Sequence, residues 1–191
     1  MTMLTRSQIE SMGFATVGEN VQISAQASFY GVGRIHIGNN VRIDDFCVLS
    51  AGEGGIQIGN YIHIAVFTCL IGAGKIELAD FCNLSSRVSI YSSSDDYSGA
   101  TMTNPTVPEK YKNVQHAPVS LGRHVIVGSG TVILPGIRLE EGVAIGALSL
   151  VTKDCLAFGV YVGNPAKRIK ERKRDLLVLE QRFLADSNAI Q

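Results

Sequence analysis

The chain has 191 residues, 46% of them hydrophobic, and its 17 Lys and Arg balance its 17 Asp and Glu. This length fits one domain with an appendage, and a formal net charge of zero gives no case for electrostatic attraction to nucleic acid or to a membrane surface. No apolar run approaches the roughly 18 residues of a membrane-spanning helix.

Residues 1–14 come before any repeat. Ser7 and Glu10 are spaced as in a capping box, and Gly13 suits the end of a helix, so a short helix is expected to cover the open end of the structure that follows. The segment lacks the basic and apolar regions of a signal peptide, and the four cysteines form no CxxC pair. We therefore expect a cytoplasmic, reduced protein.

Aliphatic residues recur at every sixth position from residue 15 to 90, and again from 119 to 151. The second stretch shows this most clearly, at Leu121, Val127, Ile133, Leu139, Ile145 and Val151. A small or aliphatic residue precedes each by two positions, as in short strands with one buried face. Sets of three repeats alternate with Gly-rich insertions, which predicts a β-solenoid whose coils have three flat sides. An ordinary β-sandwich gives no reason for the alternation to reset every six residues.

The repeat fails between Tyr91 and Pro118, where serines, prolines and the adjacent Asp95 and Asp96 mark an irregular excursion. A loop of this length inside a repeat is usually functional or disordered. Its tyrosines, methionine and prolines indicate an ordered, packed loop, although a loop merely tolerated at a corner is the alternative.

The clear repeat ends before residues 153–164, and residues 165–191 are predicted to form a helix with Pro165 at its first position. Basic residues gather near the expected helix start, where they would oppose the helix dipole. Either an anionic ligand or a solvated basic face would explain them.

Three segments together resemble the hexapeptide-repeat acyltransferases: the hexads of 119–151, GALSLVTKD at 146–154 and GNPAKRIK at 163–170. The resemblance is to the galactoside/xenobiotic type, and within it to enzymes that N-acetylate nucleotide-linked deoxyamino sugars for surface polysaccharide, such as dTDP-4-amino-4,6-dideoxyglucose acetyltransferases. It implies an all-β, left-handed parallel β-helix with a projecting loop at 91–118 and a C-terminal helix. It also implies a homotrimer with acetyl-CoA as co-substrate between subunits.

The resemblance assigns cofactor contacts to particular residues of this chain. Ser129 and Ala147 match the residues that contact the pantetheine arm in the family. Acyl transfer also needs a donor to the oxyanion, which a backbone N–H near Ser129 or Gly130 could supply. The family's contacts to the nucleotide end of coenzyme A match four residues, Thr152, Lys153, Lys167 and Lys170. The lysines among them would pair with phosphates.

The catalytic histidine of the galactoside-type enzymes is not carried over, because its position holds Asp95. An amine acceptor tolerates this loss, since about a tenth or more of an amine with a pKa near 8 is neutral at pH 7. Asp95 or Asp96 could orient a cationic amine and take its proton, and two adjacent carboxylates could raise one another's pKa. Their alternative role is to cap a turn.

Two other functions remain open. One is O-acetylation of a sugar hydroxyl with His124 or His116 as base, and the other is a non-enzymatic trimeric β-helix. His36 and His63 are interpreted as surface residues, and because the histidines are scattered over different coils no metal site is expected.

Overall fold

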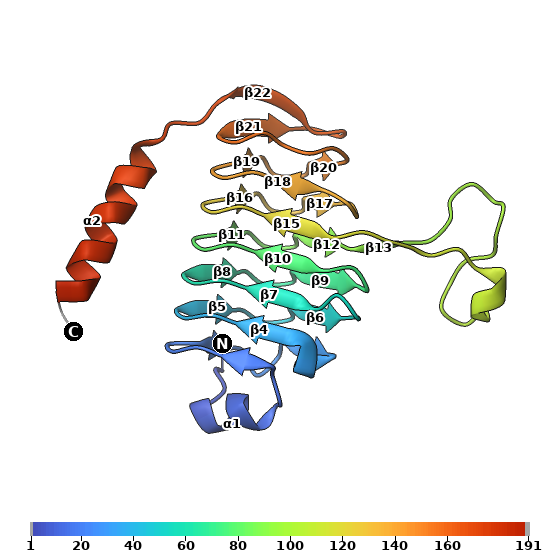
Figure 1. Cartoon of the computed structure of the whole chain (residues 1–191), viewed down its shortest axis with the longest axis horizontal. Coiled ribbons are helices and arrows are strands. Elements are labelled where there is room, and N and C mark those ends of the chain that lie inside the picture. Colours follow the sequence, from blue (N-terminus) through green and yellow to red (C-terminus); the bar gives the residue numbers. More distant parts are fainter. Residues whose placement is uncertain (1, 190–191) are drawn as a thin grey trace.

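The computed structural model describes residues 2–189, and the side chains of residues 2–186. Most of the chain winds into a left-handed parallel β-helix whose coils stack along one axis (Figure 1). Helix α1 (Arg6–Ser11) lies at the N-terminal end of the stack, and helix α2 (Asp175–Ala189) lies beside it. The predicted fold class is confirmed. None of the described helices has the length and apolarity needed to cross a membrane.

Three sheets form the sides of the β-helix. The first sheet contains β1 (Thr16–Val17), β4 (Ile35–Ile37), β7 (Ile56–Ile58), β10 (Ile76–Leu78), β15 (Val119–Leu121) and β18 (Arg138–Leu139). The second contains β2 (Gln22–Ile23), β5 (Val41–Ile43), β8 (Ile62–Ile64), β11 (Asn83–Leu84), β16 (Ile126–Val127), β19 (Ala144–Ile145), β21 (Gly159–Val162) and β22 (Lys167–Glu171). The third contains β3 (Ser28–Tyr30), β6 (Val48–Ala51), β9 (Cys69–Gly72), β12 (Ser89–Tyr91), β17 (Val132–Ile133) and β20 (Leu150–Val151).

The core is built from the inward positions of the hexads. Strands pair in parallel so that Leu84 lies beside Val127 and Val127 beside Ile145, which stacks aliphatic side chains along the axis. Val127 is fully buried and Ile145 is 3% exposed, as predicted. Cys47 and Cys82 also point inward, and burial raises the pKa of their thiols to about 11 and about 12. Both are therefore inert, unionised core residues at neutral pH.

Truncating one of these inward residues should open a cavity that the stacked coils cannot fill. Leu84→Ala is expected to lower the free energy of unfolding by about 2–5 kcal/mol, because Leu84 is fully buried between two neighbouring coils. Leu156→Ala, at an exposed leucine, is the matched control and should change it by less than about 0.5 kcal/mol. Chemical denaturation measures both. Equal effects of the two substitutions would contradict the inward assignment.

Glycine supplies positive φ at the Gly-rich insertions, as predicted, for example at Gly31 and Gly55, whereas residues with a Cβ supply it at many turns of the other two corners. At the corner between the first and second sheets, Tyr61, Phe81 and His124 all have positive φ, and their rings stack at 5.0 and 4.9 Å. Phe46 and Phe67 repeat this at the corner between the second and third sheets. A left-handed backbone costs a residue with a Cβ about 1–2 kcal/mol. Ring stacking at the strand spacing returns about 0.5–1.5 kcal/mol per pair, which offsets much of that cost.

The two ends of the chain also differ from prediction in detail. The N-cap of α1 is Thr5, whose capping box is completed by Gln8 rather than by Ser7 and Glu10. The predicted helix from Pro165 is wrong in its first part, because residues 167–171 form β22, antiparallel to β21. Helix α2 begins only at Asp175, so Lys167, Arg168 and Lys170 lie on an exposed strand, whereas residues 172–174 still directly precede the helix. Strand β21 pairs with β19, so the coil continues beyond residue 153.

Candidate active site

The loop of residues 91–118 leaves the β-helix through an antiparallel hairpin of β13 (Ser93–Ser94) and β14 (Gln115–His116), and projects well away from it (Figure 1). It carries the short 3₁₀ helix η2 (Glu109–Tyr111). The side chain of Tyr97 is 93% exposed, and Met102 and Tyr111 are also exposed. The loop is held together by its own contacts, such as the bridge between Met102 and Lys112, but these three side chains are left available to other surfaces.

His116 lies at the base of this hairpin. The amide of Ala73 donates to Ser93 Oγ at 2.7 Å, and Ser93 Oγ lies within hydrogen-bond distance of His116 Nδ1, at 2.8 Å. His116 itself is exposed. The hydrogen bond to Ser93 holds the His116 ring at the base of the hairpin.

The two adjacent carboxylates of the loop have different environments. Asp96 accepts hydrogen bonds from the Ser98 amide at 2.8 Å and from the Thr101 hydroxyl at 2.9 Å. The bonds from Ser98, then those from Thr101, lower the pKa of Asp96 to about 2. The predicted rise in pKa is therefore wrong for Asp96, which shapes the loop as a turn-capping residue does. Asp95 is exposed and lines a cavity of about 310 Å³ with Tyr91, Val132 and Pro135.

His124 points outward as expected but is covered by α2. Its Nε2 lies 2.8 Å from a carboxylate oxygen of Glu180, which Arg123 also contacts, and its ring stacks on Phe81. Burial, together with the positive charge of Arg123, lowers the pKa of His124, so the ring is neutral at pH 7. Since one nitrogen is hydrogen-bonded and one face is stacked, His124 fastens α2 to the corner rather than facing a substrate.

This arrangement predicts that His124→Asn loosens α2 and leaves acyl transfer nearly intact. We expect faster tryptic cleavage around residues 172–174, because a hydrogen bond and a ring contact that hold α2 are lost. The turnover rate should stay within about threefold of the parent, since these contacts lie far from the 91–118 loop. Timed proteolysis and steady-state kinetics measure the two effects. A drop in turnover by about two orders of magnitude, with unchanged proteolysis, would restore His124 as a base.

The residues assigned to the cofactor fall into two groups, at two different corners of the β-helix. Ser129 and Ala147 are exposed at the corner between the second and third sheets, in equivalent positions of consecutive coils, with Gly130 beside them at a φ of +72°. Thr152, Lys153, Lys167 and Lys170 are exposed on the last coils. Lys167 pairs with Val162 on the second sheet, one coil beyond Ala147, whereas Lys153 follows β20 at the next corner, so the basic groups share the C-terminal end of the β-helix but not one line.

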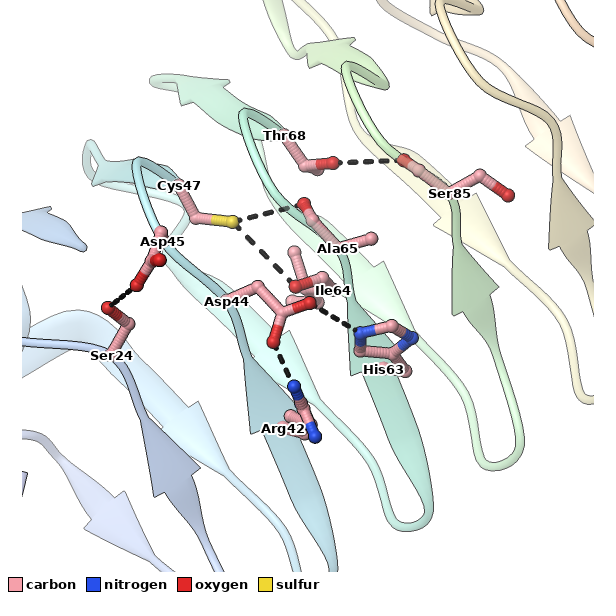
Figure 2. A network of polar contacts seen from close by, with 10 residues as sticks. All are labelled: Ser24, Arg42, Asp44, Asp45, Cys47, His63, Ile64, Ala65, Thr68 and Ser85. Atoms are coloured by element: carbon pink, nitrogen blue, oxygen red, sulfur yellow. Dashed lines mark hydrogen bonds and ion pairs between the residues drawn. The ribbon is translucent and has the colours of Figure 1, made fainter. Parts of the chain in front are cut away.

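One polar network was not predicted. Asp44, on the outer side of the second sheet, accepts from Arg42 Nε at 2.8 Å and from His63 Nε2 at 2.9 Å (Figure 2). His63, interpreted from sequence as a surface residue, is only partly exposed and has a buried carboxylate partner. Outward residues on consecutive coils are 20 or 21 positions apart in the sequence. This spacing could have predicted that His63 lies beside Arg42, once the length of that coil was known.

No family model matches the sequence. A dTDP-4-amino-4,6-dideoxy-D-glucose acyltransferase of Escherichia coli is 58% identical to this chain over 183 residues, which cover 96% of the chain and 95% of that protein. The chain belongs to the hexapeptide-repeat acyltransferases. This confirms the predicted family and identifies the chain as an enzyme rather than a non-enzymatic β-helix.

The acyltransferase is also similar to AntD, an N-acyltransferase from Bacillus cereus. The AntD structure with dTDP and 3-hydroxybutyryl-CoA has a TM-score of 0.94 and 45% identity, covering 98% of this chain and all of AntD. The structure of an AntD mutant in which a serine is replaced by alanine, with dTDP-4-amino-4,6-dideoxyglucose and coenzyme A, has a TM-score of 0.93 and 45% identity, covering 97% and 98%. Among the described residues of the acyltransferase, no three His, Cys, Asp or Glu side chains are placed to hold a metal.

Proposed function

We propose that this enzyme transfers an acetyl group from acetyl-CoA to the amine of a nucleotide-linked deoxyamino sugar. The observation that carries the proposal is the 58% identity, over nearly the whole of both chains, to an acyltransferase named for dTDP-4-amino-4,6-dideoxy-D-glucose. The AntD complexes, which hold a dTDP-amino sugar with coenzyme A or an acyl-CoA with dTDP, support the same pair of substrates.

The cofactor is proposed to lie along the corner that carries Ser129 and Ala147. Exposed lysines at the C-terminal end, Lys153, Lys167 and Lys170, supply positive charge for its phosphates. The pantetheine arm would then run toward the N-terminal coils, past Ala147 and Ser129. Because the Gly130 N–H already donates to the Ser86 carbonyl at 3.0 Å, the backbone N–H of Ser129 is the proposed donor to the thioester oxygen.

Asp95 is the proposed acceptor-binding carboxylate. In the AntD structures a serine and an aspartate ten positions apart carry substitutions, and Ser85 and Asp95 have the same spacing here. Asp95 is exposed beside the cavity at the base of the loop, whereas the oxygens of Asp96 are already bonded. An exposed carboxylate attracts the ammonium form of an amino sugar and orients it.

A homotrimer is proposed from the family resemblance, and two exposed apolar features support it. The projecting loop presents Tyr97, Met102 and Tyr111 to solvent, and the corner between the second and third sheets presents Phe46, Phe67 and Leu148. Neighbouring subunits that covered both features would bring the loop of one chain to the corner of the next. The acceptor site would then lie between subunits.

Release of free thiol from acetyl-CoA tests the proposed function. The acyltransferase should release coenzyme A with dTDP-4-amino-4,6-dideoxyglucose, and much more slowly with nucleotide sugars that lack an amine. The same assay with 3-hydroxybutyryl-CoA establishes the acyl group that it prefers. Thiol release with none of a panel of nucleotide amino sugars would contradict the proposal.

A further inference from the structure

The Asp44–His63 pair has the arrangement of an oriented proton acceptor. The side chain of Asp44 is 9% exposed, whereas that of His63 is 42% exposed, so the carboxylate is held inside and the imidazole faces outward. Figure 2 shows one ring nitrogen of His63 directed at Asp44 and the other directed away from it. The backbone fixes this geometry, because β5 and β8 pair with Arg42 beside His63.

The chemistry of the pair follows from its bonds. An ionised carboxylate only accepts, so His63 donates to Asp44 through Nε2–H, and in the neutral tautomer the lone pair of the ring lies on Nδ1. Burial opposes ionisation of Asp44, but the hydrogen bonds and charges of Arg42 and His63 outweigh it and lower the pKa of this carboxyl. Arg42 donates to the same carboxylate, so Asp44 has a cationic partner besides its bond to His63. On β11, the residue beside His63 is the uncharged Asn83.

The position of the pair is set by the strand register. Ser129 lies one coil closer to the N-terminus than Ala147, at the equivalent corner position. Both are positions proposed for pantetheine. The same row continues to Ser86 on the coil of β11, beside Ser85, and β11 pairs directly with the strand of His63. Strand β8 is two strand spacings, about 10 Å, from β16. A thioester reaching beyond Ser129 therefore approaches the outer face that carries His63.

We propose that His63, oriented by Asp44, accepts the proton of the acceptor amine during acyl transfer. This inference rests on the proposed function. The amine nitrogen forms a bond to the thioester carbonyl carbon and loses its proton to His63 Nδ1, and the carbon–sulfur bond breaks. The coenzyme A thiolate then receives that proton from the imidazolium, which restores neutral His63. Asp95 binds and orients the amine, and Asp44 is a positioning residue that holds the imidazole in one tautomer.

The first test compares His63→Ala with its parent on dTDP-4-amino-4,6-dideoxyglucose and acetyl-CoA. We expect kcat to fall about 100-fold or more, with both KM values within about threefold. Added imidazole should restore part of the rate in proportion to its neutral form, which loss of a merely structural contact would not allow. His63→Gln should lose the same activity without rescue. The matched control is His36→Ala, because His36 is an exposed histidine on β4 that is hydrogen-bonded to the Thr16 hydroxyl and not to a carboxylate of the described side chains.

The second test addresses Asp44. In nitrogen NMR spectra the His63 ring of the parent should carry its hydrogen on Nε2, and Asp44→Asn should shift the ring toward the other tautomer while lowering kcat. A parent inactive with every nucleotide amino sugar would contradict both the proposed function and this inference. An active parent whose His63→Ala variant keeps its kcat, or loses it without imidazole rescue, would overturn the role of His63 alone.

Discussion

Ala147→Trp should raise the KM for acetyl-CoA by about tenfold to 100-fold, a loss of about 1.4–2.7 kcal/mol of binding free energy. Ala147 is exposed at the corner proposed for the pantetheine arm, next to Leu148, which is 78% exposed. An indole there would occupy the space of the arm without entering the core. Initial rates over a range of acetyl-CoA concentrations measure the effect.

Ala25→Trp is the matched control for this substitution. Ala25 is exposed at the same corner on the first coil, far from the basic end, so its replacement should leave the KM for acetyl-CoA unchanged. An unchanged KM for Ala147→Trp would show that the cofactor lies elsewhere. Equal increases for both substitutions would point to a general disturbance of the β-helix.

Asp95→Asn should lower kcat/KM for the nucleotide amino sugar by about tenfold to 100-fold. The amide keeps the size of the side chain but removes the negative charge, and a hydrogen bond to a charged group contributes about 1.5–3 kcal/mol. The KM for acetyl-CoA should not change. Steady-state kinetics with each substrate varied in turn measures both parameters.

Two further variants interpret the Asp95 result. Asp175→Asn, at the start of α2, is the control for loss of a carboxylate away from the loop and should have no effect on kcat/KM. Asp96→Asn should act through the loop, because three hydrogen bonds from Ser98 and Thr101 hold that side chain. A larger loss for Asp96→Asn than for Asp95→Asn would reverse the assignment of the acceptor-binding carboxylate.

The hexad spacing was sufficient to predict the β-helix, because inward positions repeat regardless of what surrounds the coil. The alternation of inward and outward residues also predicted that His63 and His124 point outward. It could not show that α2 covers His124, since the position of a terminal helix depends on contacts such as Phe183 with Tyr61 that no repeat encodes. Nor could it show that His63 meets Asp44, 19 residues earlier, before the coil length was known.

The errors at the C-terminus have a similar cause. Residues 165–191 contain good helix formers, but residues 167–171 follow a coil edge at β21 whose backbone groups need a partner. Pairing with that edge outweighed helix propensity, which is a weak preference of at most about 0.7 kcal/mol per ordinary residue. Lys167, Arg168 and Lys170 consequently lie on the last strand, at the end of the β-helix proposed to hold the phosphates.

The central claim is that the acyl group goes to nitrogen. It is tested most directly by incubating the acyltransferase and acetyl-CoA with two matched acceptors, dTDP-4-amino-4,6-dideoxyglucose and dTDP-6-deoxyglucose, which has a hydroxyl in place of the amine. We predict a single product from the amino sugar, with NMR correlations of an amide at the amine-bearing carbon, and no detectable ester from the hydroxyl sugar. An ester formed from the hydroxyl sugar with equal or higher kcat/KM would contradict the account.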